Sequence, residues 1–84
     1  MSESVTRVLI VEDEGIVALD LHSLLGRLGL EVCGREATGE GALQKARQEE
    51  PDLILMDIRL SGEMDGISSA AAIREELDVP VIFL

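Results

Sequence analysis

Apolar and polar residues alternate along the chain in blocks that predict four strands separated by three helices. Continuous apolar runs that end at charged residues are typical of strands buried on both faces. Between these runs, apolar residues recur at steps of three and four, which is the period of a helix with one buried face. We therefore predict strands at Arg7–Val11, Leu30–Ala37, Asp52–Asp57 and Val79–Leu84, and helices at Ile16–Leu28, Gly39–Glu49 and Gly66–Leu77.

The ends of these elements carry local signals. Gly29 suits the cap that follows the first helix, and Pro51 is expected to end the second. Glycines and polar residues between positions 58 and 66 predict a loop. The first helix is expected to bury one stripe, formed by Val17, Leu21, Leu24, Leu25 and Leu28.

The alternation of strands and helices predicts an α/β fold. Apolar strands joined by helices favour an open parallel sheet with helices on both faces. The second strand has polar flanks, which indicates the edge of the sheet. In such sheets the ligand crevice lies at the carboxyl ends of the strands, where the strand order reverses.

Composition narrows the classes of function. The 84 residues carry a net charge of −10, and 46% of them are hydrophobic. A chain this apolar can form a core, so it is not expected to be a disordered acidic tail. The charge argues against direct nucleic-acid binding, and no apolar run has the roughly 20 residues needed to span a membrane. We expect a polar tail at 1–6, one domain at 7–84, and a cytoplasmic location, since Cys33 has no partner for an internal disulfide.

Acidic residues follow two of the predicted strands. Glu12 and Asp13 come after the first strand, and Asp57 ends the third. If these two strands are neighbours, the three carboxylates converge and their mutual repulsion favours a hard divalent cation such as Mg²⁺, with Mn²⁺ as a possible substitute. Beside such a cation, an aspartate can act as a nucleophile toward phosphorus. The alternative is that these acids are only solvated strand ends.

The conjunction of motifs resembles the receiver domain of two-component response regulators. The segments that carry the resemblance are Val8–Glu14, Pro51–Asp57, Met64–Gly66 and Val79–Leu84. It implies a flavodoxin-like sheet with strand order 2-1-3-4, and a function in phosphorelay signal transduction. The fifth strand and last helices of the family have no counterpart in residues 1–84, so the receiver domain is expected to be incomplete at its C-terminus.

The resemblance also implies a role for each matching residue. Asp57 matches the phosphoacceptor. Asp13 matches a direct Mg²⁺ ligand, Glu12 the other acidic ligand, and Asp57 itself and the backbone carbonyl of Arg59 complete the metal set. The backbone N–H groups of Ile58 and Arg59 are expected to meet the phosphoryl oxygens.

Two departures from the family pattern stand out. The loop after the acceptor has Ser61, Gly62 and Glu63 where a proline is usual, and it is one residue longer. The Thr or Ser after the fourth strand and the Lys at the end of the fifth are absent from this chain, whose only lysine is Lys45.

The expected partners follow from the resemblance. They are a histidine kinase or phosphotransfer protein, and an output domain or effector. The last strand, Val79–Leu84, is expected to be an unpaired edge beside a half-uncovered sheet face, which would allow a homodimer or a strand-swapped assembly.

The chain is not expected to be an enzyme on an outside substrate, although it would catalyse its own phosphorylation and dephosphorylation. Two alternatives stay open. One is a metal-dependent phosphatase or Toprim-like site, which usually shows Asp-x-Asp where this chain has Asp57–Ile58–Arg59. The other is a degenerate receiver that acts only as an interaction module.

Overall fold

The computed structural model describes residues 5–60 and 62–84, so the first four residues of the predicted tail and Ser61 lie outside the described residues. The elements are β1 (Arg7–Val11), α1 (Gly15–Arg27), β2 (Glu31–Glu36), α2 (Gly39–Glu49), β3 (Leu53–Met56), α3 (Gly66–Glu76) and β4 (Val81–Phe83). All four strands are parallel, in the order β2-β1-β3-β4. The predicted alternation and strand order are therefore confirmed.

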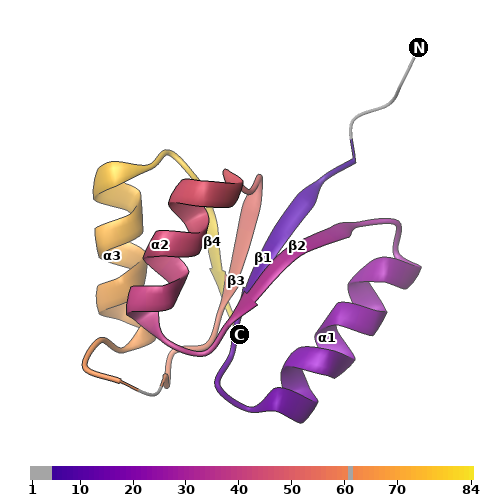
Figure 1. The fold of residues 1–84 in the computed structure, drawn as a ribbon, viewed down its shortest axis with the longest axis horizontal. Coiled ribbons are helices and arrows are strands. Elements are labelled where there is room, and N and C mark those ends of the chain that lie inside the picture. Colours follow the sequence, from indigo (N-terminus) through magenta and orange to yellow (C-terminus); the bar gives the residue numbers. More distant parts are fainter. Residues whose placement is uncertain (1–4, 61) are drawn as a thin grey trace.

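The sheet lies between two layers of helices. Figure 1 shows α1 on one side of the sheet and α2 with α3 on the other. Successive residues of β1 point to opposite faces: Leu9 and Val11 pack toward α2 and α3, whereas Val8 and Ile10 pack toward α1. All four are fully buried, as expected for a strand with a neighbour on each side and helices above and below.

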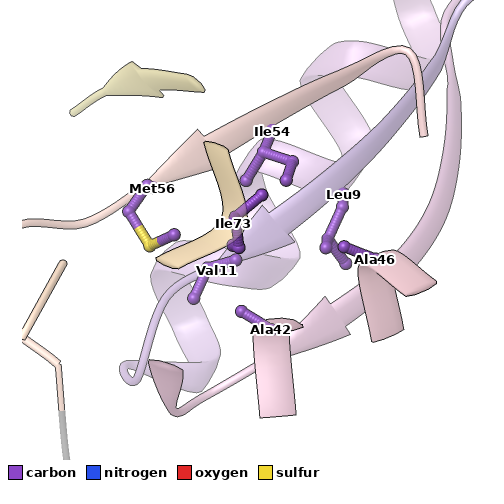
Figure 2. Close-up of a cluster of buried hydrophobic side chains, with 7 residues drawn as sticks. All are labelled: Leu9, Val11, Ala42, Ala46, Ile54, Met56 and Ile73. Carbon is purple, nitrogen blue, oxygen red and sulfur yellow. The ribbon is translucent and has the colours of Figure 1, made fainter. Parts of the chain in front are cut away.

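The larger part of the core lies under α2 and α3. Small residues on α2 allow that helix to approach the sheet closely, and Ile73 of α3 fills the space beside them. Figure 2 shows the cluster, formed by Leu9, Val11, Ala42, Ala46, Ile54, Met56 and Ile73.

The predicted buried stripe of α1 is wrong in part. The helix buries Ala18 and Leu25, whereas Val17, Leu24 and Leu28 are 37%, 46% and 67% exposed. The contact face is formed by Ala18, Leu21 and Leu25, so it keeps two residues of the predicted stripe and is rotated toward Ala18. The small side chain of Ala18 lets α1 lie close to the sheet, and periodicity alone could not reveal that a shorter residue forms the contact.

Several element ends were predicted correctly. Gly29 has a φ of 85°, and the N–H of Leu30 donates to the carbonyl of Leu25, which is the hydrogen bond of a Schellman motif. The predicted fourth strand is shorter than expected, because Pro80 has no N–H for the ladder and pairing begins at Val81.

β2 contains a bulge that sequence reasoning missed: Val8 pairs with Val32 and Leu9 with Gly34, which leaves Cys33 as the extra residue.

β4 forms one edge of the sheet, as predicted. Ile82 and Phe83 are 51% and 42% exposed, and Ile82 lies beside Leu55 on the face where α1 packs against β1 and β2. The expectation of a half-uncovered sheet face is therefore confirmed for the described residues.

Candidate functional site

The three predicted acidic residues meet at the carboxyl ends of the two central strands. β1 and β3 are neighbours, and Val11, the last residue of β1, pairs with Met56, the last residue of β3. The N–H of Asp57 then donates to the carbonyl of Val11 at 2.9 Å, which extends the ladder by one step. One carboxylate oxygen from each of Glu12, Asp13 and Asp57 lies within 4.8 Å of the other two.

The three carboxylates differ in burial. Glu12 is 8% exposed, Asp57 is half-buried, and Asp13 is exposed. Burial raises the pKa of Glu12 above its ordinary value, and the negative charge of Asp57 adds to the rise. The N–H of Glu14, which donates to Glu12 Oε2 at 3.1 Å, acts in the opposite direction on that pKa. The ionised form of Glu12 is therefore less favoured in the crevice than it would be in water, and a bound cation would offset this effect.

The donor set fits a magnesium ion. Mg²⁺ binds oxygen ligands at about 2.1 Å in octahedral geometry, so its ligands lie about 3 to 4.2 Å apart. Three oxygens within 4.8 Å of one another need only small side-chain movements to reach this spacing. The graded burial also suits the ion, because Mg²⁺ keeps several waters and the exposed side of the site leaves room for them.

A hollow of about 290 Å³ adjoins the acidic residues. It lies between the start of α1 and the end of β2, and its lining residues are Glu12, Asp13, Gly15, Ala18, Arg35, Glu36 and Ala37. Sequence reasoning did not place Arg35 near the site, because the β2 pattern showed only that it was a polar residue at a sheet edge. Arg35 pairs with Ile10 in register, and this pairing puts the two residues on the α1 face.

The segment after Asp57 is tied back to the acceptor position. The N–H of Arg59 donates to Asp57 Oδ1 at 3.1 Å, and the N–H of Gly66 donates to the carbonyl of Ile58 at 2.8 Å. Gly66 passes very close to the backbone that follows β3: a Cβ built there would lie 2.0 Å from the carbonyl oxygen of Asp57. Sequence reasoning used Gly66 as part of a motif and missed this contact.

The backbone of Ile58 and Arg59 was predicted to contact the phosphoryl group and the metal. The N–H of Arg59 lies against the Asp57 carboxylate, which is where a phosphoryl contact was expected. The phosphoryl contact of the Ile58 N–H and the metal contact of the Arg59 carbonyl stay predictions.

Asp65 caps α3. Its side chain accepts a hydrogen bond from the N–H of Ser68 at 2.7 Å, and this bond lowers the pKa of the Asp65 carboxyl below its ordinary value of 3.8. The cap therefore stabilises the fold above that ordinary value, and its contribution is lost as pH falls through the lower folded pKa.

We expect Asp65→Ala to lower the Tm at neutral pH. The difference from the wild type should shrink as the pH falls below 3.8, because the protonated carboxyl is a weaker acceptor in the wild type. Thermal melts followed by circular dichroism across this range measure the effect. Asp65→Asn is the control, since an asparagine cap keeps the acceptor without titrating; a constant difference between wild type and Asp65→Ala at every pH would contradict the assignment.

Within the part of the chain that the structure describes, no helix is long and apolar enough to cross a bilayer.

The fold and site define a parallel α/β domain with an acidic crevice at the carboxyl ends of its central strands. The family model of the response regulator receiver domain matches residues 8–84. The chain belongs to the response regulator receiver domain family. Receiver domains are regulatory, interact with kinases and effectors, and generally bind Mg²⁺ at an acidic site.

Individual relatives agree with this assignment. The transcriptional regulatory protein PdtaR of Mycobacterium tuberculosis is 36% identical over 78 residues, which cover 93% of this chain and 38% of PdtaR. The phyllosphere-induced regulator PhyR of Methylorubrum extorquens is 36% identical over 84 residues, which cover 99% of this chain and 32% of PhyR. The chain thus spans about a third of the length of these curated relatives.

A solved structure supports the fold. The receiver domain of a modulated diguanylate cyclase from Desulfovibrio desulfuricans is 39% identical, with a TM-score of 0.90 over 95% of this chain and 64% of the solved one.

Proposed function

We propose that the domain accepts a phosphoryl group on Asp57 from a histidine kinase or a phosphotransfer protein, in a reaction that requires Mg²⁺. The observation that carries the proposal is the meeting of the Glu12, Asp13 and Asp57 oxygens within 4.8 Å at the end of the central strands. Mn²⁺ offers the same preference for oxygen ligands and is the expected substitute.

The transfer itself needs few protein groups. A carboxylate oxygen of Asp57 forms a bond to phosphorus while the bond from phosphorus to the donor nitrogen breaks, and the donor imidazole keeps the electron pair and takes up a proton. The product is an acyl phosphate. A bound Mg²⁺ would screen the negative charge spread over the outer phosphoryl oxygens.

The chain's own residues hold the acceptor in place. The N–H of Arg59 fixes one oxygen of Asp57 and leaves the other to act as the nucleophile. In the phosphorylated state, we expect the N–H groups of Ile58 and Arg59 to bind the phosphoryl oxygens. Glu12 and Asp13, with Asp57 and the carbonyl of Arg59, would hold the metal.

The proposal makes the domain a switch and not an enzyme on an outside substrate. The added phosphoryl group brings up to about two negative charges, which can bias partner binding in a cytoplasmic signalling protein. An output domain or effector would receive the signal. The exposed β4 edge, with Ile82 half exposed, supports a second copy of the chain as one further partner.

The proposal is tested by incubating the protein with acetyl phosphate and Mg²⁺ and measuring its intact mass. We expect a gain of one phosphoryl group, because a single carboxylate of the crevice acts as the nucleophile. Chelation of the metal should abolish the gain, and Mn²⁺ should restore it. Labelling that continues unchanged in excess chelator would remove Glu12 and Asp13 from the metal role.

A further inference from the structure

The loop that follows Asp57 lacks the proline that is usual in the family, and a side chain from another element contacts it instead. Glu40, in the first turn of α2, accepts a hydrogen bond from the N–H of Met64 through Oε1 at 3.2 Å. Its other oxygen, Oε2, lies 3.0 Å from the position that a Cβ on Gly62 would occupy. Both oxygens of this carboxylate therefore lie against the backbone of the loop.

A second contact fixes the same loop to the same helix. The Cβ of Met64 lies 3.0 Å from the position of a Cβ on Gly39, the first residue of α2. Gly39 is buried, so Met64 packs directly on the start of the helix. The polar contact through Glu40 and the apolar contact through Gly39 hold one segment, residues 62–65, against α2.

The other end of this segment reaches the acceptor. Gly66 follows directly, donates its N–H to the carbonyl of Ile58, and lies against the carbonyl oxygen of Asp57. The N–H of Arg59 holds the Asp57 carboxylate. A shift of residues 62–65 would therefore be transmitted to the backbone that carries Asp57.

We propose that Glu40 is a positioning residue for phosphoryl transfer to Asp57, an inference that rests on the proposed function. It fixes the acceptor loop before the donor arrives, so less conformational entropy has to be lost at the transfer step. Glu40 suits this task because an acidic side chain in the first turn of a helix is stabilised by the helix dipole. The first turn of α2 is itself capped by the Thr38 side chain, which accepts a hydrogen bond from the N–H of Gly41 at 3.0 Å.

The test compares Glu40→Ala with Glu40→Gln in the rate of phosphoryl gain from acetyl phosphate and Mg²⁺. Alanine removes the acceptor for the Met64 N–H, so the rate should fall by roughly three- to tenfold. Glutamine keeps a carbonyl oxygen at the same place, so it should retain most of the rate. Hydrogen exchange of the Met64 amide, followed by NMR, should be faster in Glu40→Ala than in Glu40→Gln.

Glu75→Ala is the matched control. Glu75 is an exposed glutamate of α3, and within the described part of the chain the structure records no hydrogen bond or ion pair for it. Its removal changes the net charge by the same amount as Glu40→Ala and should leave the rate unchanged. Rates are compared at a temperature at which thermal melts show all variants fully folded.

The outcomes separate this inference from the proposed function. A wild-type rate in Glu40→Ala would overturn the inference and leave the proposed function intact. Equal slowing by alanine and glutamine would also overturn it. The slowing would then come from loss of the negative charge at residue 40 and not from loss of the oxygen that accepts the Met64 N–H. Absence of phosphoryl gain in the wild type would instead refute the proposed function, and the positioning role with it.

Discussion

Replacement of Asp57 by asparagine is expected to abolish phosphoryl incorporation while the fold is retained. The amide has nearly the same shape as the carboxylate, and its oxygen can still accept the hydrogen bond from the Arg59 N–H. It is, however, a poor nucleophile toward phosphorus, and it supplies a weaker ligand to a hard cation. Incubation with acetyl phosphate and Mg²⁺, read by intact mass, should therefore show one added phosphoryl group in the wild type and none in Asp57→Asn.

The stability of this variant should not fall. The negative charge of Asp57 contributes to the raised pKa of Glu12, so its removal relieves repulsion within the crevice. In metal-free buffer we expect a Tm equal to or above that of the wild type. This result would show that lost incorporation reflects missing chemistry and not a disrupted fold.

Asp20→Asn is a suitable control, because Asp20 is an exposed aspartate on α1, away from the ends of the strands. It should incorporate the phosphoryl group at the wild-type rate. Incorporation that persists in Asp57→Asn at the wild-type level would place the acceptor on another residue and would contradict the proposed function.

The main features of the fold and site could be predicted from the sequence, because each depends on a local pattern. A continuous apolar run ended by acids defines both a buried strand and the residues at its carboxyl end, so β1 with Glu12 and β3 with Asp57 were predicted together. That these strands are neighbours came from the resemblance, since no local pattern fixes strand order.

The features that were missed depend on distance in space. Arg35 lies beside the crevice only because β2 pairs with β1, and Glu40 contacts the loop only because α2 begins beside Met64. The bulge at Cys33 depends on the pairing of two strands, and Gly34 inside β2 is the residue type that could have indicated it. The error in α1 has a similar origin, because Ala18 joins Leu25 in the contact with the sheet, whereas Val17, Leu24 and Leu28 stay exposed.

Gly66→Ala is expected to have the largest effect on stability. A Cβ at this position would lie 2.0 Å from the carbonyl oxygen of Asp57 and 2.7 Å from the Cα of Ile58. Both obstacles are backbone atoms, so no side-chain rotation can relieve the overlap, and β3 or α3 must move. Such overpacking costs about 3 kcal/mol, and for a domain of this size it should lower the Tm by roughly 15 °C.

The same substitution should also impair the chemistry, because the atom that it displaces belongs to the proposed phosphoacceptor. At a temperature at which the variant is still folded, we expect phosphoryl incorporation to fall by roughly tenfold or more, since small displacements of reacting groups have large effects on rate.

Gly26→Ala is the matched control: it lies in α1 with nothing within 4 Å of the added Cβ. It should raise stability by about 0.5–1 kcal/mol, because alanine favours the helix over glycine. A Gly66→Ala protein with the same Tm as the wild type would show that α3 can move away from Asp57 without loss of stability. The close approach of Gly66 to Asp57 would then not be what holds the acceptor in place.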